Sequence, residues 1–138
     1  MAYWLLKSEP NAWSWDEQVK AGAKGTAWTG IRNHTAKLNM KKMKKGDRGF
    51  FYHSNIGKEI VGIVEVIKEA YPDPTSEPGS PWVCVDVKAI EPVPRPVTLA
   101  AIKAEPKLGD IQLLKQSRLS LPAITDAEWK FLCNMGGL

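Results

Sequence analysis

The sequence has 138 residues, of which 43% are hydrophobic and 25% are charged, and these values are typical of one folded domain spanning residues 1–138. No apolar run is long enough to cross a bilayer, and the apolar stretch Tyr3–Leu6 is too short for a signal peptide. We therefore expect a cytoplasmic protein with no membrane contact. The formal net charge of +4 suits a polyanionic partner but does not require one.

The chain begins with a predicted strand and a short helix. The apolar run Tyr3–Lys7 is suited to a central strand. Ser14 and Glu17 then form a capping box, because each of their side chains can satisfy a free backbone N–H at the start of a helix. We expect this helix to end near Ala21 and a loop to follow over Gly25–Gly30.

A second helix is expected from about Asn33 to just before Gly46. At helical spacing, Ala36, Met40 and Met43 share one face, which we expect to be buried. Five lysines fall in the same segment: Lys37, Lys41, Lys42, Lys44 and Lys45. Such a run is either a solvated helix face or a surface that contacts phosphates, and both interpretations stay open.

The middle of the chain is rich in strand-forming residues. Arg48–Ser54 and Ile60–Ala70, joined by a turn at Gly57, predict an antiparallel hairpin. Four prolines in Tyr71–Pro81 predict a loop. The alternation of valines with other residues over Trp82–Ile90 is typical of a half-buried strand.

Two capped helices are predicted near the C-terminus. Thr98 can cap a helix over 99–104. Thr125 and Glu128 form a second capping box for a final helix that ends at Gly136. Mixed strands with helices around them indicate an α+β fold, which we expect to be a small barrel.

Trp28 stands out among six tryptophans because it lies in a run of small residues outside any apolar period. It is either a core residue or a platform on which a base can stack. Gly30 permits close approach of a ligand, Arg32 can hold a phosphate, and Asn33 can bond a base edge or cap the second helix. Three other tryptophans lie in periodic segments and are expected in the core: Trp4, Trp82 and Trp129.

Motifs of well-known enzymes are absent. The sequence has no P-loop, no G-x-G-x-x-G, no G-x-S-x-G and no H-E-x-x-H. Only His34 and His53 are available as imidazole ligands, and Cys84 and Cys133 lie far apart, so we expect buried free thiols, no metal and no cofactor. No residue is assigned a catalytic role.

Seven blocks in order resemble the EVE family over the whole chain. They are Tyr3-Trp-Leu-Leu-Lys-Ser-Glu-Pro10, Trp28-Thr-Gly-Ile-Arg-Asn33, Met43-x-x-Gly-Asp47, Tyr52-His-Ser-Asn55, Tyr71-Pro-Asp-Pro74, Val97-Thr-Leu99 and Ser117-Arg-Leu-Ser120. The resemblance implies a PUA-like fold, a mixed β-barrel with peripheral helices, related to the ASCH and YTH domains. It also implies modified bases of DNA or RNA as ligands, including methylated or hydroxymethylated cytosine.

The same resemblance implies a set of ligand-binding residues. Trp28 would stack on a flipped base, Ser8 and Asn33 would bond its edge, and Asp73 would accept from a cytosine amino group. Arg32, Arg118 and some of the lysines would hold phosphates. The full set is Lys7, Ser8, Trp28, Gly30, Arg32, Asn33, Tyr52, His53, Ser54, Asn55, Tyr71, Asp73, Arg118 and Ser120.

Three functional hypotheses follow. The first is a non-catalytic, monomeric module that binds DNA or RNA carrying a modified base. The alternative is an enzyme that acts on a modified nucleobase or a nucleotide-like small molecule, with His53, Asp73 and Ser54 as acid–base candidates in the same pocket. The third is a small-molecule or protein-interaction module that does not bind nucleic acid.

Overall fold

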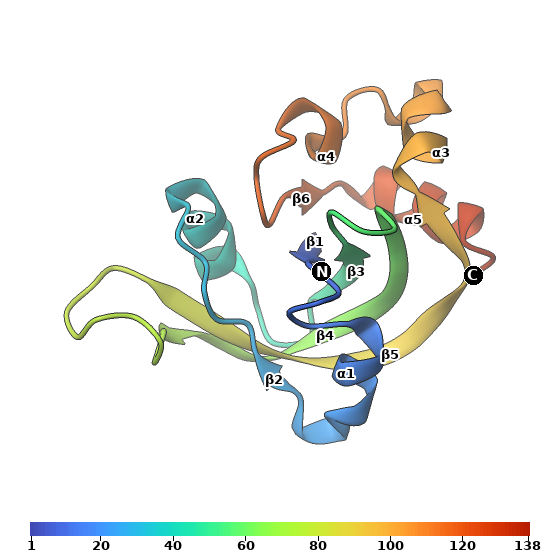
Figure 1. The fold of residues 1–138 in the computed structure, drawn as a ribbon. Coiled ribbons are helices and arrows are strands. Elements are labelled where there is room, and N and C mark those ends of the chain that lie inside the picture. The colour runs from blue at the N-terminus through green and yellow to red at the C-terminus, as the bar shows by residue number, and fades with distance from the viewer.

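The computed structural model describes all residues, Met1–Leu138, and is organised by one six-stranded sheet (Figure 1). The strands are β1 (Tyr3–Ser8), β2 (Thr26–Ala27), β3 (Arg48–His53), β4 (Glu59–Pro72), β5 (Val83–Thr98) and β6 (Ala123–Ile124). The α-helices are α1 (Trp15–Lys20), α2 (His34–Lys42), α3 (Leu99–Ala104), α4 (Gln112–Lys115) and α5 (Asp126–Met135), with single 3-10 turns at Gly22–Lys24 and Pro106–Leu108. No helix is both long enough and apolar enough to span a membrane.

The strand order is β2-β5-β4-β3-β1-β6, with β1 and β3 parallel and every other neighbouring pair antiparallel. The α+β class and the peripheral helices are confirmed, but the expected closed barrel is wrong because the sheet is open. Its two edge strands, β2 and β6, are only two residues long and lie at opposite ends of the strand order. Strands so short cannot close the sheet on itself.

The two longest strands, β4 and β5, extend beyond their predicted limits. β4 continues through Pro72, so the expected proline-rich loop begins only at Asp73. β5 runs through three prolines to Thr98. The pairing register places Val97 opposite Ile60 but Pro92 opposite Gly62, so the intervening residues of β5 form a bulge. A bulge interrupts the hydrogen-bond ladder, and this is where a strand tolerates residues without an N–H.

Hydrophobic cores lie on both faces of the sheet. Along β1, Trp4 and Leu6 belong to one core, and Leu5 belongs to the other. The first core contains the buried side of α2 and the second contains α5, whose Trp129 stacks between Tyr3 and Phe50. The core positions predicted for Trp4 and Trp129 are therefore confirmed. Figure 1 shows α2 well separated from the C-terminal helices.

Helix α2 begins and packs as its sequence predicts. The Asn33 side chain caps it by accepting a hydrogen bond from the Ala36 N–H at 2.9 Å. Ala36, Met40 and Met43 are buried. The carboxylate of Asp47 then accepts from the Lys44 N–H at 3.0 Å and from Trp4 Nε1 at 3.3 Å, which ties the end of this helix to β1.

The capping boxes at Ser14 and Thr125 and the cap at Thr98 are also present. In the first of these helices, Trp15 lies on β4 where Gly62 leaves room for its indole ring, and a Cβ atom at position 62 would overlap that ring. The ring also packs edge-on against Phe51 at a centroid distance of 5.4 Å. Gly62 therefore allows α1 to approach the sheet.

We expect Gly62→Ala to lower the free energy of unfolding by about 1–3 kcal/mol, because the added methyl group forces the indole out of its packed position. Urea denaturation measures this change. In a Trp15→Leu background the same substitution should cost clearly less, since the overlapping ring is gone. An equal cost in both backgrounds would show that contact with the indole is not the cause.

Candidate functional site

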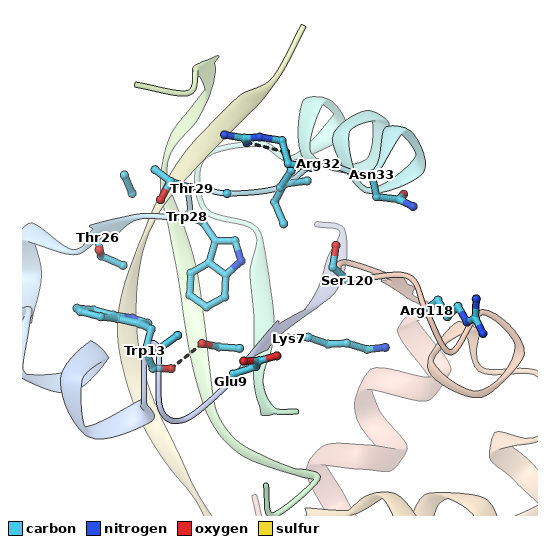
Figure 2. Close-up of a pocket in the computed structure, with 15 residues that line it drawn as sticks. Lys7, Glu9, Trp13, Thr26, Trp28, Thr29, Arg32, Asn33, Arg118 and Ser120 are labelled. Carbon is cyan, nitrogen blue, oxygen red and sulfur yellow. Dashed lines mark hydrogen bonds between the residues drawn. The ribbon is translucent and has the colours of Figure 1, made fainter. Parts of the chain in front are cut away.

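A pocket of about 720 Å³ opens at the carboxyl end of β1 (Figure 2). Its volume is in the range of small-molecule sites. Fifteen residues from three segments line it: Lys7, Ser8, Glu9, Ala12 and Trp13 from β1 and the turn after it; Thr26, Ala27, Trp28, Thr29, Gly30, Ile31, Arg32 and Asn33 from β2 and the loop before α2; Arg118 and Ser120 from the segment before β6.

Backbone hydrogen bonds bring the three segments together. On one side of β1, the Lys7 N–H donates to the Ser120 carbonyl at 3.2 Å. On the other flank of the pocket, the Trp28 N–H donates to the Val85 carbonyl of β5 at 2.7 Å. The pocket wall is thus built from main-chain pairing across the sheet, and its side chains project from backbone that is already fixed.

Trp28 belongs to the core and to the pocket wall at once. Only 7% of the residue is exposed, and its ring packs edge-on against Phe51 at a centroid distance of 5.6 Å. Most of the indole is therefore a core side chain, and its remaining exposed surface borders the pocket. A second indole, that of half-buried Trp13, also lines the pocket and donates from Nε1 to Gln18 Oε1 at 2.8 Å.

The polar groups of the pocket are partly engaged by the protein itself. Lys7 Nζ donates to the Ser117 carbonyl at 2.9 Å, and burial lowers the pKa of this amine. Ser8 Oγ donates to the Trp13 carbonyl at 2.6 Å, so its hydroxyl oxygen can only accept from a ligand. The Asn33 cap uses the carbonyl oxygen of the side chain and leaves the amide N–H groups to donate.

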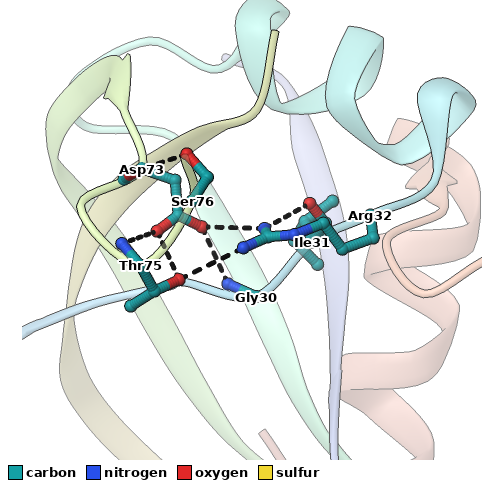
Figure 3. A network of polar contacts seen from close by, with 6 residues as sticks. All are labelled: Gly30, Ile31, Arg32, Asp73, Thr75 and Ser76. Atoms are coloured by element: carbon teal, nitrogen blue, oxygen red, sulfur yellow. Dashed lines mark hydrogen bonds and ion pairs between the residues drawn. The ribbon is translucent and has the colours of Figure 1, made fainter. Parts of the chain in front are cut away.

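Asp73 was predicted to contact a base, but it does not line the pocket and instead lies in a network of polar contacts with Gly30, Arg32 and Thr75 (Figure 3). Its side chain is fully buried and accepts from the Gly30 N–H at 2.9 Å, Arg32 Nη1 at 3.1 Å, and both the N–H and the hydroxyl of Thr75 at 2.7 Å. These four donors use the acceptor capacity of the carboxylate. Asp73 therefore positions the loop that carries Gly30 and Arg32, and it has no free oxygen for a cytosine amino group.

The same contacts determine how Asp73 titrates. Burial alone would raise the pKa of the carboxyl group, but the hydrogen bonds from Thr75, Gly30 and Arg32 outweigh it and lower the pKa to about 2. A carboxyl group with a depressed pKa stabilises the folded protein above its unfolded pKa, and the contribution is lost as the pH falls through the folded pKa.

Eight of the fourteen predicted ligand-binding residues line the pocket: Lys7, Ser8, Trp28, Gly30, Arg32, Asn33, Arg118 and Ser120. The other six do not: Tyr52, His53, Ser54, Asn55, Tyr71 and Asp73. The prediction also missed seven residues that do: Glu9, Ala12, Trp13, Thr26, Ala27, Thr29 and Ile31. Several of the missed residues are next to predicted ones in the sequence. This adjacency was the one feature of the sequence that could have indicated that they line the pocket.

The residues at and after the end of β3 lie outside the pocket for identifiable reasons. Tyr52 is buried in the second core. His53 Nε2 accepts from the Trp15 N–H at 3.1 Å, and burial lowers the pKa of this imidazole. The Ser54 N–H donates to the Ser8 carbonyl, and Asn55 bonds to Glu9. Tyr52 and His53 are therefore held in packing and capping contacts, while the turn after them contacts the pocket-lining turn from behind.

Tyr71 is likewise occupied away from the pocket. Its hydroxyl donates to the Asp86 carboxylate, and this hydrogen bond, followed by burial, raises the pKa of the phenol. Cys84 is a buried free thiol, as expected, and Cys133 is a partly buried one. No group of three potential metal-binding side chains comes together anywhere in the chain.

A basic and aromatic rim, formed by Arg32, His34, Lys37 and Trp82, lies at the start of α2, and Arg32 is the member that lines the pocket. The prediction that Trp82 is a core residue is wrong, because its ring is partly exposed. The His34 ring lies 4.8 Å from it, and the cationic groups of Arg32 and Lys37 lie 5.8 and 5.9 Å from its centroid. The five lysines of the predicted helix form no salt bridge. Their charges are available to an external anion.

We expect Asp73→Asn to lower the free energy of unfolding at pH 7 by about 1–3 kcal/mol. The NH₂ group of the new amide would face N–H and O–H donors whose hydrogen bonds the carboxylate accepted. The difference from wild type should shrink as the pH falls from about 4 towards the folded-state pKa of about 2, because the unfolded wild type takes up a proton at Asp73 before the folded protein does. Urea denaturation over this pH range measures it. Asp110→Asn, at a highly exposed ion pair, should change stability by less than about 1 kcal/mol and is the control. A pH-independent difference for Asp73→Asn would contradict the assigned role.

Comparison with known proteins agrees with this architecture. The Rhodopseudomonas palustris protein Rpa0253, solved by NMR, has a TM-score of 0.94 at 64% identity and is matched over 99% of this chain and 94% of that one. The crystal structure of human THYN1 protein in complex with 5-methylcytosine containing DNA has a TM-score of 0.89 at 30% identity, over 99% and 98% of the two chains. The Mmi1 YTH domain, at 13% identity and a TM-score of 0.59, shares the fold alone.

Sequence comparison gives the same result. Mouse thymocyte nuclear protein 1 is 33% identical over 96% of this chain and 73% of its own length. The family model described as the EVE domain matches residues 2–135. The resemblance inferred from the seven sequence blocks is therefore confirmed, and the chain belongs to the EVE domain family.

Proposed function

We propose that this protein is a non-catalytic nucleic-acid-binding module that takes one modified base, a methylated or hydroxymethylated cytosine, into the pocket lined by Trp13 and Trp28. The observation that carries the proposal is a pocket of about 720 Å³ whose lining combines two indoles with the cationic side chains of Lys7, Arg32 and Arg118. A human protein of the same fold has been crystallised with DNA containing 5-methylcytosine, which supports this choice of base.

The energetics of base capture are compatible with such a pocket. Extruding a base costs a few kcal/mol, and stacking on an aromatic side chain returns about 1–3 kcal/mol per base. Trp13 and Trp28 supply the aromatic surface for stacking. Hydrogen bonds from the amide of Asn33 to the base would contribute further binding energy. Burial of one methyl group contributes about 1 kcal/mol, so the expected preference for a methylated base is about fivefold.

Phosphate contacts would come from the cations around the opening. Arg118 and Lys7 lie on the side of β6, and Arg32 and Lys37 lie on the side of α2 (Figure 2 labels all but Lys37). In this function the lysine-rich helix α2 contacts phosphates, which is one of the two interpretations that its sequence left open. Cations on both sides of the opening can hold the backbone on either side of an extruded nucleotide.

The enzyme alternative has less support. Its three acid–base candidates, His53, Asp73 and Ser54, do not line the pocket. Asp73 is fully buried with its acceptors used, and the Nε2 atom of His53 is bonded to the main chain of Trp15. Of the proton-transferring side chains that do line the pocket, Lys7 is bonded through Nζ to the Ser117 carbonyl, and Glu9 has one carboxylate oxygen bonded to Asn55.

We expect Ala12→Leu to abolish the preference for a modified base while non-specific binding persists. Ala12 is exposed and lines the pocket, so a larger side chain fills the space without disturbing the core. Fluorescence anisotropy with matched 5-methylcytosine and cytosine oligonucleotides measures the preference. Ala23→Leu, at an exposed alanine outside the pocket, should behave as wild type. If Ala12→Leu keeps the wild-type preference, the base does not bind in this pocket.

We expect Arg118→Gln to weaken binding to all oligonucleotides alike and to reduce the slope of log Kd against log salt by about 1, as the loss of one phosphate contact requires. Titrations at several salt concentrations measure the slope. Arg95→Gln changes the net charge equally at an exposed site outside the pocket and should leave the slope unchanged. Absence of binding even at low salt would refute nucleic-acid binding and favour a small-molecule or protein-interaction role.

A further inference from the structure

Glu9 is the one acidic residue that lines the pocket. One of its carboxylate oxygens, Oε1, accepts a hydrogen bond from Asn55 Nδ2 at 2.7 Å. The other oxygen, Oε2, accepts no hydrogen bond, and the carboxylate takes part in none of the salt bridges, even though Lys7 lies two residues away. The pocket therefore presents a free anionic acceptor beside its two indoles.

Asn55 holds this acceptor in place from behind the pocket. It lies in the turn after β3, where its φ of 65° is in the left-handed region that asparagine tolerates. The neighbouring Ser54 N–H donates to the Ser8 carbonyl at 2.9 Å, which fastens the turn to the residue that precedes Glu9. Because the Asn55 amide group donates to one oxygen of Glu9, the orientation of the other oxygen is restricted.

A fixed acceptor distinguishes nucleobases by the group they carry at one edge. Cytosine presents an amino group, a donor, next to ring acceptors, whereas thymine and uracil present a keto oxygen in the same place. A carboxylate oxygen pairs with the amino group and repels the keto oxygen. 5-Methylcytosine and thymine both carry the 5-methyl group, so an apolar wall that senses the methyl cannot tell them apart and a polar group must do so.

We propose that Glu9, oriented by Asn55, selects an amino-bearing base over a keto base, with Glu9 as the specificity-determining residue and Asn55 as its positioning residue. This inference rests on the proposed function, since it concerns the base that enters the same pocket. Asn55 was predicted to touch the ligand directly, and here it acts through Glu9.

The experiment measures the ratio of affinities for two single-stranded probes made of thymidine except for one central position. One probe carries 5-methylcytosine there and the other carries thymine, so the ratio isolates the central base. Fluorescence anisotropy gives both dissociation constants. Wild type should bind the 5-methylcytosine probe about tenfold more tightly, because a charge-assisted hydrogen bond is replaced by a repulsive contact in the thymine probe.

Glu9→Gln tests the acceptor itself. In the orientation that Asn55 has here, its NH₂ group donates to the oxygen of the glutamine amide, and the glutamine NH₂ group then faces the pocket. An NH₂ group donates to the keto oxygen of thymine and not to an amino group. The preference of wild type should therefore be lost or inverted, with an absolute gain in thymine binding that a general structural defect would not produce.

Asn55→Gly tests the positioning residue. Glycine accepts a φ of 65° without strain, so the turn is retained while the donor to Glu9 is removed. The preference for 5-methylcytosine should decrease, and the melting temperature should stay close to that of wild type. Glu91→Gln, at an exposed glutamate outside the pocket, is the matched control and should keep the wild-type ratio.

The outcomes separate this inference from the proposed function. If wild type binds neither probe, nor a duplex containing 5-methylcytosine, the proposed function fails. If wild type binds 5-methylcytosine more tightly than cytosine but Glu9→Gln keeps the wild-type ratio over thymine, the proposed function stands and the role of Glu9 is overturned. An adenine-centred probe that binds more tightly than a guanine-centred one would support the same rule for purines, whereas the reverse order would oppose it.

Discussion

The backbone of β1 is hydrogen-bonded on both sides, to the parallel strand β3 on one and to the segment that leads into β6 on the other. Its side chains alternate between two cores, so Trp4 and Leu6 pack under α2 while Leu5 packs toward α5. The strand has no freedom to shift, because a slip by one residue would exchange its two faces. The pocket forms at its carboxyl end, where Lys7 and Ser8 are still paired with β3 and Glu9 is the first residue beyond the strand.

Around this fixed strand, residues behind the pocket position the residues that line it. Asp73 holds Gly30 and Arg32 from the start of the loop between β4 and β5, and Asn55 holds Glu9 from the turn after β3. Both contacts join residues more than forty positions apart in the sequence. In each case a hydrogen bond restricts a flexible group before a ligand arrives, which reduces the ordering cost of binding.

Charge in and around the pocket is divided by function. The cations of α2 and the Arg118 segment lie at the rim, where they are exposed and can attract a polyanion without regard to its sequence. The single carboxylate, that of Glu9, lines the pocket itself, where contact with a base edge can discriminate between bases. An anionic group in a basic opening slightly reduces the attraction of the pocket for a polyanion. The proposed selection of an amino-bearing base gives a reason for the presence of Glu9.

Local features of the structure were determined by the sequence alone. The caps at Ser14, Asn33 and Thr125 were readable because each depends on groups three residues apart, and the buried face of α2 followed from helical spacing. The pattern of strands and helices indicated the α+β class, and family resemblance supplied a residue set of which eight members line the pocket. The open sheet was not readable, because closure depends on how far edge strands extend, and the prolines of β5 concealed a strand that continues through a bulge.

Only the tertiary structure decided which polar residues face a ligand and which support those that do. Asp73 and Asn55 have the side chains expected of a binding site, but long-range hydrogen bonds to Gly30, Arg32 and Glu9 use their groups. For Trp28 both environments were open, and it packs in the core against Phe51, whereas Trp82, expected in the core, is partly exposed beside His34. Sequence patterns report spacing along the chain, whereas burial and hydrogen-bond partners arise from segments that the sheet brings together.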